Sequence, residues 1–127
     1  MHNYIVLHEL GHAIGFYHEH NRPDRDNYID VIYDNIESDF KYAFYKAEEG
    51  QSSTLGFRYN LQSIMHYSRG AFSKNGSDTI RLKNGTATSF GTARQLSPLD
   101  IAKANKFYNC GKELASYSLY LPTLLKI

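Results

Sequence analysis

Apolar residues recur with a helical period near the start of the chain, in residues 4–16. At about 100° per residue, they spread over an arc of roughly 200° around the helical axis. A surface helix shows an apolar stripe of about 100° or a little more, so an arc this wide is typical of a helix buried between two layers. The residues that form it are Ile5, Val6, Leu7, Leu10, Ala13, Ile14 and Phe16. The pattern therefore predicts a helix that needs cover on two sides.

Two elements are predicted in the middle of the chain. Residues 38–49 have a helical pattern, which Ser38 would open as an N-cap and Gly50 would end. Residues 77–83 predict a strand, because an Asn-Gly turn signal stands on either side of them. The stretch from Tyr17 to Asp34 is polar and rich in turn formers, so we expect it to be irregular.

A last helix is predicted from Pro98 to Tyr108. Ser97 is suited to the N-cap, proline is favoured at the first helical position, and Asp100 stands at the third position in place of the usual Glu. These elements together predict an α+β fold with much irregular loop.

The first predicted helix carries candidate metal ligands. His8 and His12 are four residues apart, so on a helix they lie within roughly 40° of each other and one turn apart. Two imidazoles placed in this way can hold one zinc ion through ring nitrogens at about 2.0–2.1 Å. Glu9 is rotated by about 100° from His8, where a carboxylate can take a proton from a metal-bound water without being a ligand.

The residues after this helix provide a third candidate ligand. Gly15 can end the helix in a left-handed conformation, and the chain can then turn so that His18 completes a site of three histidines. Three protein ligands leave one position open for water, as in catalytic zinc sites. An isolated H-E-x-x-H arises by chance on many surface helices, but the full H-E-x-x-H-x-x-G-x-x-H spacing is specific. His2 and His20 are surplus to the motif, and we expect both to face solvent.

The sequence resembles one branch of the metzincin zinc peptidases. "HELGHAIGFYHEHNRPDRDNYI" (residues 8–29) is similar to the active-site segment of the astacin family of zinc endopeptidases. "SIMHYSRGAFS" (residues 63–73) is similar to the Met-turn of that family. The resemblance runs from about residue 4 to Cys110 and implies a partial astacin-like catalytic domain over residues 1–110. Residues 111–127 form a tail outside the resemblance, and the sequence does not indicate its role.

The resemblance also implies roles for three later residues. Met65 would lie beneath the metal site, and Tyr67 would bind zinc as an additional ligand or move away to stabilise the transition state. Ordinary core packing is the alternative for Tyr67, which is one of eleven tyrosines. The family links the residue equivalent to Glu19 to the mature N-terminus, and this chain does not begin at the family's N-terminus.

Family resemblance further implies that part of the catalytic domain lies outside this chain. The family has an N-terminal sheet subdomain whose edge strand binds the peptide substrate, and it would cover the zinc helix. In the family, the cysteine equivalent to Cys110, the single cysteine here, pairs with one near the start of the domain. The parent protein is expected to be secreted, although the first residues show no signal peptide. Asn75 and Asn84 lie in candidate glycosylation sequons.

The composition of the chain argues against two kinds of binding partner, nucleic acid and the membrane interior. A formal net charge of +1 gives no reason to expect nucleic acid, and no apolar run approaches the roughly 18 residues of a membrane span. Two hypotheses of different class remain. The first is a zinc endopeptidase that cleaves peptide or protein substrates. The second is a non-catalytic zinc-binding fragment, or a degenerate copy, that serves only as a structural or interaction module.

Overall fold

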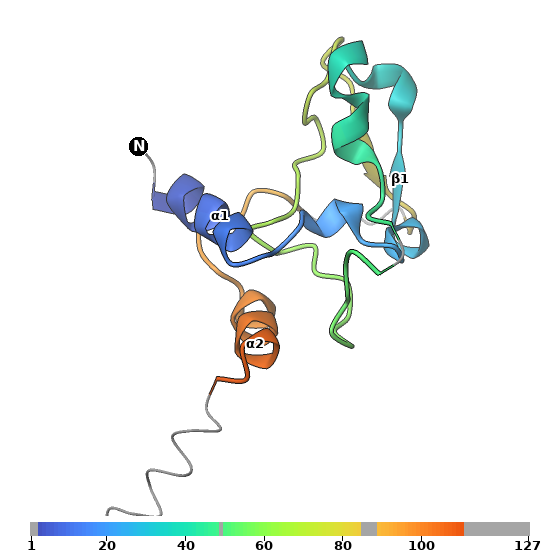
Figure 1. Cartoon of the computed structure of the whole chain (residues 1–127). Helices are drawn as coiled ribbons and strands as arrows, with labels where there is room; N and C mark the ends of the chain where they lie inside the picture. Colours follow the sequence, from blue (N-terminus) through green and yellow to red (C-terminus); the bar gives the residue numbers. More distant parts are fainter. Residues whose placement is uncertain (1–2, 49, 85–88, 111–127) are drawn as a thin grey trace, which may run out of the picture.

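The computed structural model describes residues 3–48, 50–84 and 89–110. Two α-helices lie in this part of the chain, α1 (Asn3–Ala13) and α2 (Pro98–Phe107). Figure 1 shows both helices on one side of the molecule, while the strands and most of the short 3-10 helices lie on the other. The 3-10 helices are η1 (Glu19–Asn21), η2 (Arg25–Asn27), η3 (Tyr33–Asn35) and η4 (Ser38–Phe44).

The sheet has two short antiparallel strands, β1 (Ile29–Val31) and β2 (Ile80–Leu82), in the described residues. Ile29 is opposite Leu82, and Val31 is opposite Ile80. The strand predicted over 77–83 is β2, which is shorter than predicted at both ends. β1 lies in the stretch that we expected to be irregular. It was missed because three residues give too little alternation to identify a strand.

The main core lies between this sheet and the segments that follow it. Its buried members come from distant parts of the chain and are Ile29, Ile36, Phe44, Tyr59, Ile80 and Phe90. Phe44 is fully buried at the end of η4, so this short helix is fixed to the sheet by its last residue.

The helix predicted over residues 38–49 is present only in part, because the chain forms a 3-10 helix that begins at Ser38 and ends at Phe44. Asn21 donates to the carbonyls of Ala43 and Tyr45, at 3.0 and 2.6 Å, and Arg25 donates to that of Phe44 at 2.5 Å. These carbonyls are therefore bound by side chains from η1 and η2, and the chain at Tyr45 is extended rather than helical. No side chain caps the start of η4 either.

Helix α1 was predicted to reach Phe16 and ends at Ala13. Gly15 has φ of +92° and donates from its N–H to the carbonyl of His12, while the N–H of Phe16 donates to the carbonyl of Gly11. This pair of bonds is the Schellman arrangement, in which the glycine adopts the left-handed conformation. The predicted role of Gly15 is confirmed, and the turn directs the chain back toward the helix.

Helix α2 begins with a complete capping box. The Ser97 hydroxyl accepts from the N–H of Asp100, and the Asp100 carboxylate accepts from the N–H of Ser97. The predicted cap is confirmed. The tail over residues 111–127 lies outside the described residues, as does His2.

Candidate metal centre

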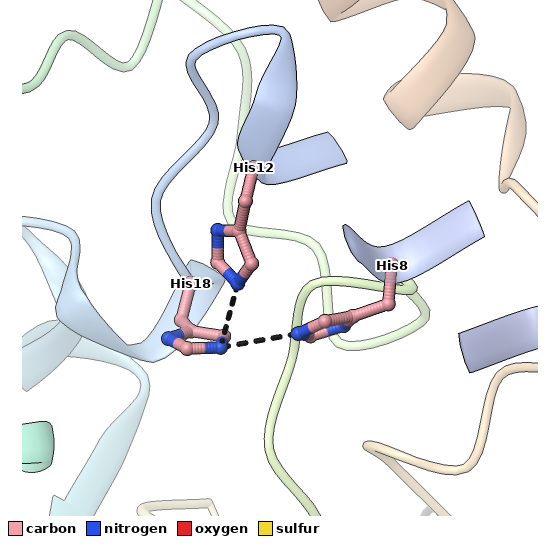
Figure 2. Close-up of side chains that lie close together, drawn as sticks. All are labelled: His8, His12 and His18. Atoms are coloured by element: carbon pink, nitrogen blue, oxygen red, sulfur yellow. Dashed lines mark hydrogen bonds between the residues drawn. The ribbon is translucent and has the colours of Figure 1, made fainter. Parts of the chain in front are cut away.

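Three histidines converge at the C-terminal end of α1. The Nε2 atom of His18 lies 3.2 Å from Nε2 of His8 and 3.1 Å from Nε2 of His12. Figure 2 shows the two α1 imidazoles and that of His18 directed at one point from different sides. Among the described residues, these three form the one group of His, Cys, Asp or Glu side chains that meets the geometry of a metal site.

The spacing of these nitrogens fits a zinc ion. Two nitrogens at about 2.0–2.1 Å from one tetrahedral ion lie roughly 3.3–3.4 Å apart. The observed separations of 3.1 and 3.2 Å are close to this value. Three imidazole nitrogens are also a donor set that zinc accepts, and they leave a fourth position for water.

The other ring nitrogens of the α1 histidines hold the rings in place. Nδ1 of His8 donates to the carbonyl of Ile64 at 2.7 Å, and Nδ1 of His12 donates to the carbonyl of Phe16 at 2.8 Å. A proton on Nδ1 leaves Nε2 as the free acceptor, which is the form that binds a metal. Both rings are therefore fixed in tautomer and direction by the backbone.

The third ring is kept neutral by its surroundings. Burial, followed by the nearby His12 and His8, lowers the pKa of His18 to about 3. An imidazole with so low a pKa is uncharged at neutral pH, and a neutral nitrogen is what a metal ion requires.

Met65 lies under α1 at the point where the helix has no side chain. It is buried, and a Cβ placed on Gly11 would lie 2.5 Å from its sulfur atom. A larger residue at position 11 would therefore displace the thioether. The structure places Met65 in packing contact with the metal-site helix, as expected of a flexible, gap-filling side chain.

Tyr67 lies beside the metal centre. Its ring centroid is 4.4 Å from that of His18 and 4.0 Å from that of His20. Burial, then the charges of Tyr42 and Glu9, raises the pKa of its phenol above the usual value. Tyr67 therefore keeps its proton at neutral pH and is a hydrogen-bond donor. Glu9 is exposed on α1 and is not one of the three converging side chains.

His20 was expected to face solvent, and this prediction is wrong. The residue is fully buried, and its Nε2 donates to the carbonyl of Ala43 at 3.1 Å. Its ring packs against those of Tyr67 and Phe44, with the Phe44 centroid 5.4 Å away. The burial depends on η4 folding across this loop, which no local pattern indicates.

The carboxylate after the third histidine is also buried. One oxygen of Glu19 accepts from Arg22 at 3.0 Å and from the N–H of Asn60 at 2.8 Å, and the other accepts from Lys103 at 2.5 Å. Sequence reasoning did not identify Lys103, which lies 84 positions from Glu19. The one local signal for Lys103 is its position three residues after Asp100, which places both residues on the same face of a capped helix.

Residues 1–109 match the peptidase family described as Astacin. The chain belongs to the astacin family. Over 110 residues it is 50% identical to Tolloid-like protein 1 of Homo sapiens, a match that covers 84% of this chain and 11% of that protein. Over 107 residues it is 48% identical to Zinc metalloproteinase nas-6 of Caenorhabditis elegans, with coverages of 84% and 31%.

The fold agrees with that of a solved zinc-protease. High choriolytic enzyme 1, a hatching enzyme zinc-protease from Oryzias latipes (medaka fish), aligns with a TM-score of 0.79 at 39% identity. The alignment covers 84% of this chain and 52% of that one. The predicted class, a partial astacin catalytic domain, is thus confirmed, and the chain spans about half of this relative. Among the described residues, no helix is long and apolar enough to cross a membrane.

Proposed function

We propose that the chain forms the C-terminal half of a zinc-dependent endopeptidase domain, secreted as part of a longer protein, that hydrolyses peptide bonds in peptide or protein substrates. The observation that carries the proposal is the convergence of three imidazole Nε2 atoms at 3.1–3.2 Å. Two of these imidazoles are already oriented by backbone carbonyls. A pre-oriented set of three nitrogen donors is typical of catalytic zinc.

His8, His12 and His18 would hold the ion. Zinc in such a site supplies Lewis acidity, which lowers the pKa of a coordinated water toward neutrality. Glu9 would accept a proton from the attacking water and deliver it to the leaving amine, as a general base and then a general acid. The exposed position of Glu9 next to His8 supports this role, because its carboxylate is accessible to a water at the metal site.

Tyr67 would donate its phenolic hydrogen bond to the oxygen that becomes negative as the peptide carbonyl is attacked. Its raised pKa supports this role, because a phenol must keep its proton to donate. The nearby ring of His18 supports it too, since the phenol is packed against a residue of the metal site.

The test is the zinc content of the purified chain, measured after dialysis. His12→Ala should lose zinc, because it removes one of three donors. Tyr17→Ala is the matched control, because Tyr17 is an exposed residue of the segment that connects His12 to His18. Zinc content that stays the same in His12→Ala would contradict the assignment.

The second hypothesis is a zinc-binding module without catalytic activity. It is favoured by the exposed apolar face of α1, where Leu10 is 53% exposed. A subdomain outside the chain would cover this face in a complete catalytic domain. Cleavage of a peptide library by the chain alone, compared with the chain joined to an astacin N-terminal subdomain, separates the two hypotheses. The enzyme hypothesis predicts activity in the joined protein, and the module hypothesis predicts none in either.

A further inference from the structure

Two charged residues lie on the buried face of α2, a helix in which half of the residues are exposed. Asp100 and Lys103 are one turn apart and both are buried, whereas Ile101 and Phe107 are about half exposed. A charged side chain is costly to bury unless it is paired and hydrogen-bonded. The contacts of these two residues therefore show what the buried face of α2 does.

Asp100 fixes the backbone of the Met-turn. One carboxylate oxygen accepts from the hydroxyl of Ser63 at 2.6 Å, and the other accepts from the N–H of Ile64 at 3.2 Å. The Ser63 hydroxyl in turn accepts from the N–H of Met65 at 3.0 Å. Asp100 thus binds Ser63 and Ile64 directly and Met65 through the Ser63 hydroxyl, in addition to its capping bond with Ser97.

The carbonyls of the same turn bind the metal-site segments. The carbonyl of Ile64 accepts from Nδ1 of His8 at 2.7 Å. The carbonyl of Met65 accepts from the N–H of Glu19 at 2.9 Å, and Glu19 directly follows His18. Asp100 is therefore connected to two of the three histidines through a single turn of backbone.

Lys103 reaches the segment of His18 by a second route. Its ammonium donates to one oxygen of Glu19 at 2.5 Å, while Arg22 and the N–H of Asn60 hold the other oxygen. Both partners of the Lys103 contact are buried, so water screens it little.

We propose that Asp100 and Lys103 are positioning residues of the metal centre, and that α2 sets the orientation of His8 and His18 through them. The inference rests on the proposed zinc site and adds residues that contact neither the metal nor the substrate. Outer-shell partners of metal ligands typically change metal affinity by 10–100-fold when they are removed. Asp100 and Lys103 act through such partners.

The decisive variant is Asp100→Asn, with Ser97→Ala as the matched control. Both changes weaken the capping box, and Ser97→Ala also removes the acceptor of the Asn60 amide, but Asp100→Asn alone removes the carboxylate that holds Ser63 and Ile64. The zinc dissociation constant of the full chain is measured by competition with a chelator. We expect it to rise by about 10–100-fold in Asp100→Asn and to stay within about threefold of wild type in Ser97→Ala. Equal affinities in the two variants would overturn the proposal.

A second measurement is made without metal, by ¹⁵N NMR of the imidazole nitrogens. In wild type, His8 should be the Nδ1–H tautomer, and in Asp100→Asn it should become a mixture. A chain that binds no zinc but shows this change would refute the proposed function and support the positioning role. A wild type that binds zinc, with an unchanged His8 tautomer in Asp100→Asn, would refute the positioning role alone.

Two further variants cover the case in which Asp100→Asn does not fold. Ser63→Ala removes a single hydroxyl between Asp100 and Met65, and we expect a loss of zinc affinity near the lower end of that range. Lys103→Met removes the ammonium, with Lys106→Met as an exposed control on the same helix. Unchanged zinc affinity in both Ser63→Ala and Lys103→Met would overturn the proposal.

Discussion

Helix α1 has two faces within eleven residues, and they are packed very differently. On the inner face, His8 and His12 are hydrogen-bonded to backbone carbonyls, and Gly11 is in contact with Met65. On the outer face, apolar side chains are exposed, including Leu10 at 53% and Val6 at 41%. The histidines of the inner face therefore have their hydrogen-bond partners, whereas the apolar side chains of the outer face lack a packing partner among the described residues.

The outer face borders a cavity of about 410 Å³ between α1, α2 and the loop over residues 51–55. Leu10 of α1 and Ile14, which directly follows the helix, line it together with Ile101 and Phe107 of α2. The wide apolar arc predicted for α1 is therefore only partly covered. The apolar side of α2 is also about half exposed, and it borders the same cavity. Metal chemistry needs donors within a few ångströms, whereas burial of a helix needs a second layer from elsewhere. The two requirements can be met by different parts of a protein.

The largest effect should follow a change at Glu9, the exposed neighbour of His8, that leaves the packing intact. Glu9→Gln in the parent catalytic domain should retain zinc, because Glu9 is not among the converging donors. It should lose peptide cleavage by about 10²–10⁴-fold, the range for a general base. Zinc analysis and a fluorogenic peptide assay measure the two properties. Near-normal turnover in Glu9→Gln would show that the proton is taken by another group.

Tyr67→Phe should have a smaller effect on the same reaction. Loss of one donor to a developing oxyanion costs about 10²–10³-fold in kcat, with zinc still bound. The aromatic contacts with His18 and His20 remain in the variant, so its melting temperature should be close to wild type. Tyr42→Phe is the control, since Tyr42 is an exposed phenol close enough to influence Tyr67. An equal loss of kcat in both variants would remove the special role of Tyr67.

His18, which faces the two histidines of α1, should make the stability of the chain sensitive to acid. The folded chain lowers the pKa of His18 from 6.5 to about 3, so between these values the unfolded state binds more protons. The stability that this provides is fully present above pH 6.5 and is lost as the pH falls toward 3. Chemical denaturation of the metal-free chain from pH 7 to pH 4 measures the slope. His18→Gln should reduce the slope of the free energy of unfolding against pH. An unchanged slope would show that other groups cause the acid sensitivity.

The two faces also differ in how far sequence could predict them. The three histidines were found because one helix and the turn at Gly15 determine their spacing, which is a local property of eleven residues. The partners of Glu19 were not found, because Lys103 is 84 positions away and is brought close only by the fold. The burial of His20 was missed for the same reason, since η4 covers it.

Strand prediction failed in a related way. Residues 77–83 carry turn signals at both ends, so β2 was expected there, but β1 is three residues long and is defined by its partner rather than by its own pattern. In the same way, Asp100 was identified as a helix cap from its position three residues after Ser97. Its bonds to Ser63 and Ile64 depend on where the Met-turn lies in the fold.

The smallest expected effect on chemistry comes from the outer face, and it is the sharpest test of the comparison. Exposed apolar patches that border a cavity promote association, so we expect the wild-type chain to self-associate when it is expressed alone. Leu10→Gln with Ile101→Gln should reduce this association, as measured by sedimentation velocity. Because both side chains are about half exposed, the free energy of unfolding should change by only about 0.5 kcal/mol. Zinc affinity should be unchanged, because neither apolar side chain takes part in the hydrogen bonds that orient His8 and His12. A monomeric wild type, or a loss of zinc in the double variant, would show that the two faces of α1 are not independent.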